Sequence, residues 1–324
     1  MKKVLIMMAT YNGEKYIRQQ IESIIAQDYP EWHLIVQDDG SKDHTKEIVQ
    51  EYCKKDSRIE WTVNDCGHHG VCYNFHALIN KCKSLKGYDY FVFCDQDDIW
   101  YPNKLRTLMA RFQNDEIPIM CYGDMYVIDG DGNRTADSFY GTFKRSMKNK
   151  YGIVFTNIIY GCNTMMNRKL FELVPPLDLE KEYVSYMMHD AFYARIATFC
   201  GKILYVKTPC MEYRRHGSNV SHNEESKTLA TYFRLAFNLD ELASFYARSF
   251  NQVLVSLKCI RKVGNQRAVA AAKYYEKVVR SSGVDAYLES RKYIDWGNYR
   301  REMGRFLVIT SGLHKKYLLK PKEI

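Results

Sequence analysis

The chain has 324 residues, 46% of them hydrophobic, which is enough to form one large domain or two smaller ones with a buried core. Its ten cysteines are scattered without a Cys-x-x-Cys pair, which argues against a zinc site or a disulfide framework and for a reducing compartment. The net charge of +9 is uneven, because residues 226–324 carry +11 and the preceding residues −2. We therefore expect two regions, residues 1–222 and a basic region of residues 223–324.

Strands and helices alternate through the first region. Apolar runs predict strands at residues 4–9, 33–37, 58–63, 90–94, 120–129 and 203–206. Apolar residues at helical spacing predict helices around residues 17–25, 48–53, 71–82 and 105–112. This order predicts an α/β fold with a mostly parallel sheet covered by helices. The run at residues 4–9 is too short for a signal peptide, and no stretch reaches transmembrane length, so we expect a cytoplasmic protein.

Three carboxylates, Asp95, Asp97 and Asp98, directly follow the predicted strand at residues 90–94. Packing them together costs like-charge repulsion, and Mg²⁺ or Mn²⁺ relieves it because hard cations prefer oxygen ligands. A solvated acidic loop is the alternative. The carboxyl ends of parallel strands bind ligands in open α/β sheets, and Thr10 and Asp38 end two other strands at the same edge. This arrangement favours a metal and nucleotide site.

Six motifs occur together, in an order and spacing that resemble family 2 glycosyltransferases of the GT-A fold. They are Ala9-Thr10-Tyr11-Asn12-Gly13, Gln37-Asp38-Asp39-Gly40-Ser41, Asp95-Gln96-Asp97-Asp98, Gly161-Cys162-Asn163, His189-Asp190 and Tyr213-Arg214-Arg215-His216-Gly217-Ser218-Asn219. The last set resembles the bacterial rhamnosyltransferase-like branch, whose members build rhamnan, O-antigen and capsular polysaccharides. The resemblance covers residues 1 to about 222. It implies a Rossmann-like sheet, a nucleotide-sugar donor, and a glycan or lipid-linked acceptor.

The resemblance also implies roles for particular residues. Thr10, Tyr11, Asn12 and Asp39 would hold the nucleotide base, with turn and helix capping as the alternative for Asp38 or Asp39. Asp95 would lie near the ribose, with Gln96 in the variable position. The metal, Mn²⁺ or Mg²⁺, would be bound by Asp97, and His216 would complete the metal or diphosphate site unless it is a structural loop histidine. Arg214 and Arg215 would neutralise phosphate oxygens or face solvent.

Asp190 stands where the family places its catalytic base, at the start of a predicted helix. A base there takes the proton of the acceptor hydroxyl during in-line attack and gives inversion at the anomeric carbon. A plain helix cap is the alternative, and the two roles are compatible. We expect dTDP-L-rhamnose as the donor, with a UDP-hexose as the alternative. A protein that binds nucleotide-sugars without catalysis is the alternative from another class.

The basic region is helical by pattern, with apolar residues at helical spacing around residues 229–237, 242–246 and 268–279. Lysines and arginines between its aromatic residues suit an anionic membrane surface, which would make the enzyme peripheral on the inner face of the plasma membrane. A helical subdomain packed on the catalytic region, or a homodimer interface, explains the pattern equally well. No nucleic-acid-binding motif is present, so we expect no nucleic-acid partner.

Overall fold

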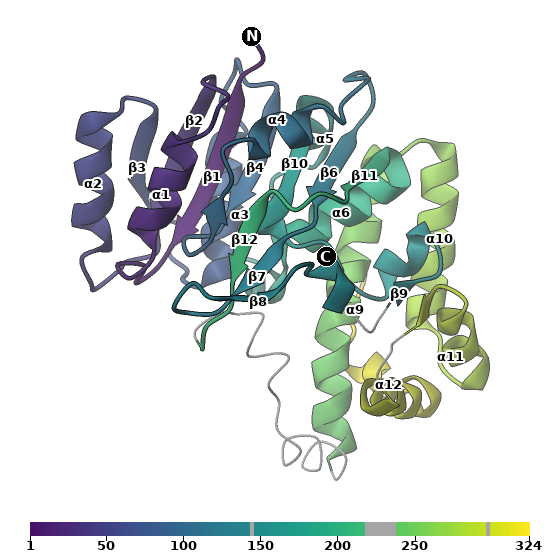
Figure 1. Cartoon of the computed structure of the whole chain (residues 1–324). Helices are drawn as coiled ribbons and strands as arrows, with labels where there is room; N and C mark the ends of the chain where they lie inside the picture. Colours follow the sequence, from purple (N-terminus) through teal and green to yellow (C-terminus); the bar gives the residue numbers. More distant parts are fainter. Residues whose placement is uncertain (143–145, 218–237, 296–298) are drawn as a thin grey trace. The chain divides into compact units, whose positions relative to one another are not determined.

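The computed structural model describes residues 1–142, 146–217, 238–295 and 299–324 (Figure 1). The chain forms two compact units. The first comprises Met1–Thr142, Ile159–Tyr193 and Gly201–Arg214, and the second Phe143–Ile158, Ala194–Cys200 and Arg215–Ile324. The boundary expected at residue 222 lies outside the described residues. All ten cysteines lie within these residues, and none of them forms a disulfide there.

A seven-stranded sheet forms the centre of the first unit (Figure 1). Its order is β11-β6-β10-β4-β1-β2-β3, and all neighbours are parallel except β10, which runs antiparallel to β4 and β6. The mostly parallel sheet predicted from the sequence is therefore confirmed. The strands are β1 (Val4–Thr10), β2 (Trp32–Asp38), β3 (Ile59–Val63), β4 (Tyr90–Cys94), β6 (Ile119–Gly123), β10 (Thr164–Asn167) and β11 (Lys202–Val206).

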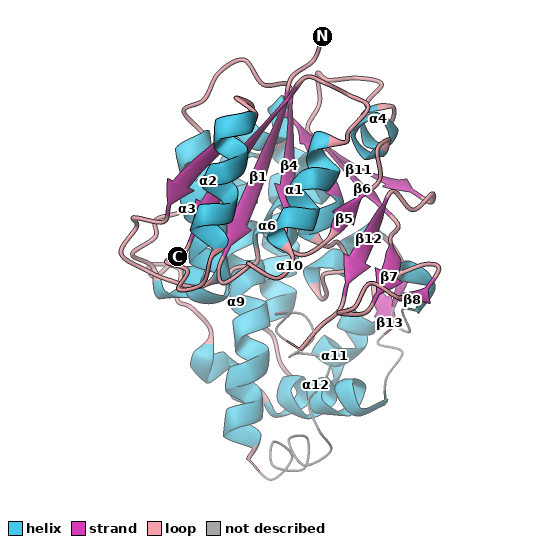
Figure 2. Cartoon of the chain, turned by 60° about the vertical axis from the view of Figure 1, so that its left-hand side comes forward, coloured by secondary structure: helices cyan, strands magenta, loops and turns pink. Residues whose placement is uncertain are grey.

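Helices cover both faces of this sheet, as the apolar runs of its central strands require. Helices α1 (Ile17–Ile25) and α2 (Thr45–Lys55) cover one face (Figures 1 and 2). Helices α3 (Val71–Cys82), α5 (Arg168–Leu173) and the start of α6 (His189–Cys200) cover the other. On that face Phe91 stacks on Phe171 with 3.8 Å between ring centroids, and Phe93 meets Phe75 edge-on at 6.0 Å. Helix α4 (Lys104–Met109) follows β5.

A four-stranded sheet lies beyond the carboxyl ends of the large one, with the order β5-β12-β7-β8. Its strands are β5 (Ile99–Trp100), β12 (Met211–Arg214), β7 (Tyr126–Ile128) and β8 (Arg134–Ala136). The single strand predicted at residues 120–129 is wrong, because β6 and β7 belong to different sheets. The Asp124 carboxylate accepts the amide of Met125 at 2.8 Å and that of Tyr140 at 3.2 Å, and this local bonding replaces a continued ladder.

The second unit is mainly helical, which confirms the helical C-terminal region. It contains α9 (Leu239–Val263), α10 (Gln266–Arg280), α11 (Val284–Arg291), α12 (Tyr299–Ser311), the short strands β9 (Ser146–Met147) and β13 (Ile294–Asp295), and the 3-10 helices at Lys150–Val154 and Leu313–Tyr317. Tyr275 packs against Tyr151, Phe155 and Tyr293 in its core. The helix expected around residues 229–237 lies outside the described residues. Within the described part of the chain, no helix is both long and apolar enough to cross a membrane.

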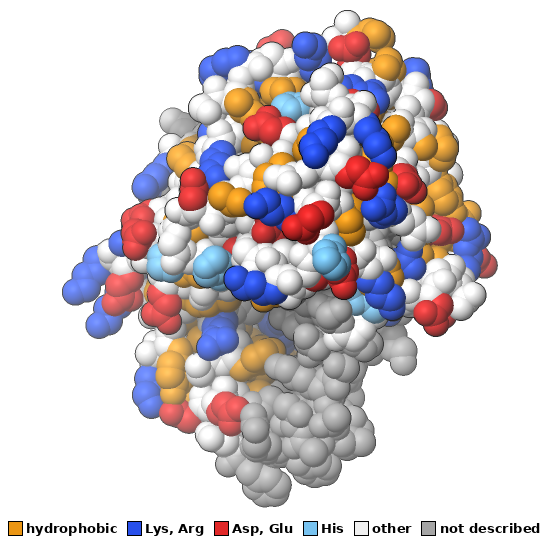
Figure 3. Space-filling view, turned by 90° about the vertical axis from the view of Figure 1, so that its left-hand side faces the viewer, with side chains coloured by type: hydrophobic (Ala, Val, Ile, Leu, Met, Phe, Trp, Pro, Cys, Tyr) orange, Lys and Arg blue, Asp and Glu red, His pale blue; other side chains and the backbone are white. Residues whose placement is uncertain are grey.

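Acidic and basic side chains are interspersed on the face shown in Figure 3. This mixture agrees with the nearly neutral balance of the residues before 226. The excess positive charge of the chain belongs to the C-terminal region, as its sequence requires.

Candidate active site

Three parallel strands end side by side at one edge of the large sheet. Thr10 pairs with Asp38 across β1 and β2, and Met8 pairs with Cys94 across β1 and β4. The residues that follow these strands, Asp39 and Asp95 among them, therefore emerge at the same edge. The expected convergence of the strand ends is confirmed.

Asp39 is buried at this edge and accepts hydrogen bonds from the loop that joins β3 to α3. Its Oδ2 accepts the amide of Gly70 at 2.6 Å, and its Oδ1 accepts the side-chain amide of Asn64 at 2.7 Å. Nδ1 of His69 lies 3.1 Å from the same Oδ1. Asp39 thus also caps the start of α3, whose residue Asn74 bonds the carbonyl oxygens of Thr10 and Gln37 at 3.3 and 3.1 Å.

Asp38 closes the turn after β2. Its Oδ2 accepts the amides of Gly40 and Ser41 at 3.0 and 2.9 Å, so the capping interpretation describes Asp38. Asn12 links this turn to the end of β1, because its amide donates to Ser41 Oγ at 2.9 Å and its side-chain oxygen accepts the amide of Lys42 at 2.8 Å. Asn12 has a φ of 46°, a left-handed conformation that asparagine tolerates better than most residues.

Gln96 joins the ends of β1 and β4. Its Oε1 accepts the hydroxyl of Thr10 and the amide of Tyr11, the latter at 2.9 Å, and its Nε2 donates to the Tyr11 carbonyl at 3.1 Å. A Cβ at Gly13 would lie 2.5 Å from Gln96 Oε1, so a larger residue there would push the Gln96 side chain out of these hydrogen bonds. The side chain of Tyr11 is 53% exposed, which leaves its ring accessible for stacking on a base.

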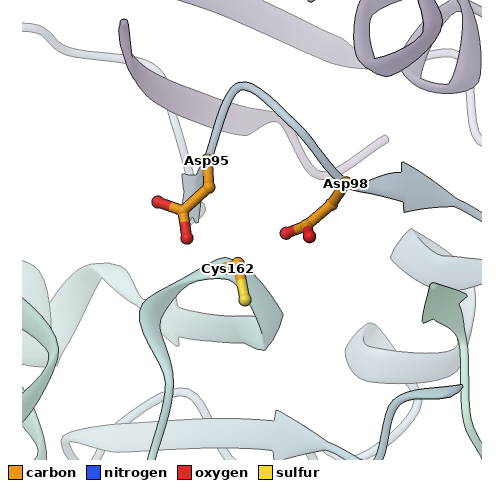
Figure 4. A group of neighbouring side chains, drawn as sticks. All are labelled: Asp95, Asp98 and Cys162. Atoms are coloured by element: carbon orange, nitrogen blue, oxygen red, sulfur yellow. The ribbon is translucent and has the colours of Figure 1, made fainter. Parts of the chain in front are cut away.

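Asp95, Asp98 and Cys162 face one another beyond the end of β4 (Figure 4). One ligand atom from each lies within 4.8 Å of the others. Asp98 is buried, and its Oδ1 accepts the amide of Arg214 at 3.0 Å. Its Oδ2 has no hydrogen-bond partner among the described residues. A buried oxygen without a partner costs free energy, and a cation removes that cost.

The electrostatics of this cluster suit a hard divalent cation. Burial, reinforced by Asp97 and Asp190, raises the pKa of Asp95 to about 7. Burial, with Asp97 and Asp95, raises the pKa of Asp98 well above its ordinary value. Burial likewise raises the pKa of the Cys162 thiol, which keeps it neutral and a poor ligand for Mg²⁺ or Mn²⁺. The two carboxylates are therefore the fitting donors of this group.

Asp97, the ligand expected from the sequence, is buried between Asp95 and Asp98 in the same loop. Its backbone oxygen accepts Nε of Arg214 at 2.8 Å. Arg214 is itself buried, and it donates to the side chain of Gln19 at 2.6 Å and lies over the ring of Tyr16. Arg214 therefore holds the acidic loop in place through these hydrogen bonds. Its expected role in binding phosphate stays a prediction. Arg215 and His216 are half-buried members of the second unit.

Asp190 lies in the first turn of α6 and is buried. Its Oδ2 accepts the amide of Gly161 at 3.1 Å, and its Oδ1 accepts the amide of Ala191 at 2.5 Å. The neighbouring His189 stacks on Phe75 with 3.8 Å between ring centroids, and burial lowers its pKa well below its ordinary value. His189 is thus a neutral core residue. Asp190 is the member of the pair whose negative charge helps to raise the pKa of Asp95.

Sequence reasoning placed Asp98 in one carboxylate cluster with Asp95 and Asp97, but it assigned the metal to Asp97 and did not single out Cys162 as a neighbour of these acids. Cys162 belonged to a recognised motif, but its distance of more than sixty positions from the acids gave no signal that it faces them. Only the pairing of β10 with β4 brings the two segments together.

A mostly parallel, helix-covered sheet with an acidic loop after its central strand defines the GT-A class of nucleotide-sugar transferase folds. The chain belongs to glycosyl transferase family 2, whose sequence pattern matches residues 5–174. Among solved structures, the Staphylococcus aureus TarS fragment 1–349 in complex with UDP-GlcNAc is similar in fold. Its TM-score is 0.51 at 14% identity, with 98% of this chain and 93% of that chain covered.

Three bacterial glycosyltransferases are similar in sequence to this chain. The Escherichia coli UDP-Glc:alpha-D-GlcNAc-diphosphoundecaprenol beta-1,3-glucosyltransferase WfgD is 30% identical over 223 residues, which cover 68% of this chain and 80% of the relative. The Shigella flexneri dTDP-rhamnosyl transferase RfbG is 29% identical over 241 residues, which cover 68% and 78%. An uncharacterized glycosyltransferase of Rickettsia bellii is 25% identical over 90% of this chain, but only 42% of its own length is matched.

Proposed function

We propose that this glycosyltransferase transfers a sugar, with inversion, from a pyrimidine nucleotide-sugar to a glycan or lipid-linked acceptor in bacterial cell-surface polysaccharide synthesis. The observation that carries the proposal is the arrangement of the carboxylates at the sheet edge. Oδ2 of Asp190 accepts the amide of Gly161, and the next residue, Cys162, faces Asp95 and Asp98, so the acidic loop and the start of α6 lie around one site. Such a pairing brings together a group for the donor and a group for the acceptor.

The residues of β1 and β2 suit the nucleotide. Tyr11 offers an exposed ring to the base, and Asp39 offers a carboxylate to the N3–H of a pyrimidine. Asp39 Oδ1 already meets Asn64 and His69, and the exposed His69 is the partner that can give way to a base. Thr10 and Asn12 hold the two turns around this position.

Asp190 suits the role of catalytic base. Two backbone amides hold its carboxylate in place and stabilise its charge. In the reaction its oxygen takes the proton of the acceptor hydroxyl, the acceptor oxygen bonds to the anomeric carbon, and the bond from that carbon to the diphosphate oxygen breaks. A single displacement of this kind inverts the anomeric configuration and forms no glycosyl-enzyme.

Asp95, Asp97 and Asp98 are the residues that would hold Mn²⁺ or Mg²⁺, with His216 as the further ligand that the sequence suggests. The cation supplies Lewis-acid stabilisation of the departing diphosphate. The unpartnered Oδ2 of Asp98 supports this assignment.

For the sugar that is transferred, dTDP-L-rhamnose and a UDP-hexose are the two candidate donors. The names of the relatives WfgD and RfbG include one donor of each kind, at similar identity to this chain. A panel of dTDP-rhamnose, UDP-glucose, UDP-galactose and UDP-GlcNAc, with and without Mn²⁺, tests the proposal by thermal shift and by nucleotide release. Stabilisation by a donor without any transfer would favour a non-catalytic binding protein.

We also propose that the basic C-terminal region brings the enzyme to the anionic inner face of the plasma membrane, where a lipid-linked acceptor lies. Its described helices carry large apolar side chains that are exposed, among them Phe245, Val284, Leu288 and Phe306. Lysines and arginines of the same helices suit anionic headgroups. A homodimer that covers these side chains is the competing explanation.

A further inference from the structure

Lys104, the first residue of α4, is completely buried, and no other lysine of the described chain lies in the core. Its Nζ donates a hydrogen bond to the carbonyl oxygen of Cys162 at 2.7 Å and to Sδ of Met211 at 3.0 Å. It also lies 3.9 Å from the ring centroid of Trp100. A carbonyl oxygen, a thioether and an indole face are all electron-rich, and together they suit an ammonium group.

The burial of Lys104 is costly and needs a reason. Moving an ammonium group out of water costs several kcal/mol unless it is paired. In the parts of the chain that the structure describes, no carboxylate lies within ion-pair distance of its Nζ. Burial lowers the pKa of Lys104, although nearby Cys210, Cys162, Cys94 and Asp98 oppose that shift. An apolar side chain would fill the same space without this cost, so packing alone does not account for a lysine.

The hydrogen bond to Cys162 fixes the short 3-10 helix Gly161–Asn163, which we call the 161–163 turn. The amide of Gly161 in this turn donates to Oδ2 of Asp190 at 3.1 Å. A Cβ at Gly161 would lie 2.6 Å from Nε2 of His189, so the turn packs against the start of α6 without spare room. A movement of the turn would therefore move Asp190 or break its hydrogen bond.

The same lysine acts on the acidic loop. Its charge opposes the rise in pKa of Asp95 and of Asp98, and the Cys162 side chain in the turn faces both carboxylates. Lys104 thus acts on the groups assigned to the donor and, through the turn, on the group assigned to the acceptor. Because it is fully buried, it does so through the backbone of the turn.

We propose that Lys104 is a positioning residue, which holds the 161–163 turn so that the Asp190 carboxylate keeps a fixed place relative to Asp95 and Asp98. The inference rests on the proposed function and deepens it.

The test compares Lys104→Met with a matched control, Lys83→Met. Lys83 also donates to backbone carbonyl oxygens, one of them Val174 at 2.6 Å, and lies 4.0 Å from the ring centroid of Phe171, so these contacts are made at the end of α5. Amide hydrogen exchange at Gly161, measured on the whole protein without ligands, reports the turn directly. Turnover per folded enzyme, with UDP-glucose or dTDP-rhamnose according to which the wild type uses, reports the reaction.

In Lys104→Met we expect Gly161 exchange to quicken by about tenfold, because the loss of one hydrogen bond frees the turn. Turnover should fall by about 10- to 100-fold, the cost of a catalytic group displaced by about 1 Å. The affinity for UDP with Mn²⁺ should change much less than turnover. Lys83→Met should lose thermal stability only. Equal behaviour of the two variants, or wild-type exchange at Gly161 in Lys104→Met, would overturn the proposal.

Two further arms keep the result decisive. If Lys104→Met does not fold, Lys104→Leu removes the donor with another apolar shape, and unchanged exchange at Gly161 in that variant would count against the proposal. If the wild type transfers no sugar from any donor, the proposed function fails. The exchange measurement needs no substrate, so it still decides whether Lys104 holds the turn.

Discussion

The backbone amide of Arg214 donates a 3.0 Å hydrogen bond to Oδ1 of Asp98, and one oxygen of that carboxylate lies within 4.8 Å of ligand atoms of Asp95 and Cys162. One oxygen is thus held by the fold, while Oδ2 has no hydrogen-bond partner among the described residues. A carboxylate with one oxygen anchored and the other without a partner is suited to bind a metal ion. Removing its charge should therefore weaken metal-dependent binding while leaving the metal-free protein at least as stable.

Replacing Asp98 by Asn should weaken Mn²⁺-dependent UDP binding without destabilising the protein in the absence of metal. The Asn side-chain oxygen still accepts the Arg214 amide, and the change removes a buried acid whose pKa burial has raised. We expect an unchanged or higher melting temperature in chelator, and a loss of at least about tenfold in affinity, since outer and inner ligands each contribute on that scale. Calorimetric titration and thermal melts measure the two effects. Wild-type Mn²⁺-dependent affinity in this variant would remove Asp98 from the metal site.

Asp97→Ala tests the ligand expected from the sequence. If Asp97 binds the metal, the variant should lose sugar transfer and the Mn²⁺-dependent part of nucleotide binding. The fold should survive, because the hydrogen bond from Nε of Arg214 goes to the backbone oxygen of residue 97, which alanine keeps. Circular dichroism serves as the control for folding. Full activity of Asp97→Ala in chelator would end the metal hypothesis for the whole acidic loop.

The pKa of Asp95 predicts how the stability of the metal-free protein depends on pH. Burial and the nearby acids raise this pKa from 3.8 to about 7. Between these values the native state binds more protons than the unfolded state, so stability falls as the pH rises through the window. From pH 5 to pH 7.5 we expect the wild type to lose about 1–3 kcal/mol relative to Asp95→Asn. Urea unfolding in chelator at several pH values measures the difference. Parallel pH curves for the two proteins would show that Asp95 titrates normally.

The sequence allowed the central part of the site to be predicted because local patterns define it. Apolar runs mark β1, β2 and β4, and the residues that follow them necessarily meet at one edge of a parallel sheet. The antiparallel insertion of β10, between β4 and β6, has no comparable local signal. The contacts of Cys162 and Lys104 depend on that insertion, so they emerge only in three dimensions. Gln96 shows the same limit, because its position after β4 does not reveal that it ties Thr10 and Tyr11 in place.

The membrane proposal predicts binding to anionic vesicles that salt weakens. At low salt the whole protein should float with vesicles that contain phosphatidylglycerol, since each lysine or arginine near such a surface contributes about 1 kcal/mol. Vesicles of phosphatidylcholine alone are the control, and Leu288→Glu on the exposed side of α11 should reduce flotation. Sedimentation equilibrium of the same samples distinguishes a dimer. A stable dimer that stays off both kinds of vesicle would contradict the membrane proposal.

Asp190→Asn separates a catalytic base from a helix cap. The carboxylate accepts one amide with each oxygen, from Gly161 and from Ala191, and Asn can accept only one of them. We therefore expect a loss of about 1–3 kcal/mol in stability from the bond that is lost. If Asp190 is the base, turnover of the folded enzyme should also fall by about 10² to 10⁴, because Asn cannot take the acceptor proton. UDP binding with Mn²⁺ should stay near the wild-type value.

Asp56→Asn is the matched control. Asp56 accepts the amide of Arg58 at 2.9 Å just before the start of β3, at the end of that strand away from the site, so its replacement should affect stability alone. NMR of the product against the donor anomer checks the inversion that a single displacement requires. Retention of configuration, or normal turnover by Asp190→Asn, would show that this carboxylate only caps α6.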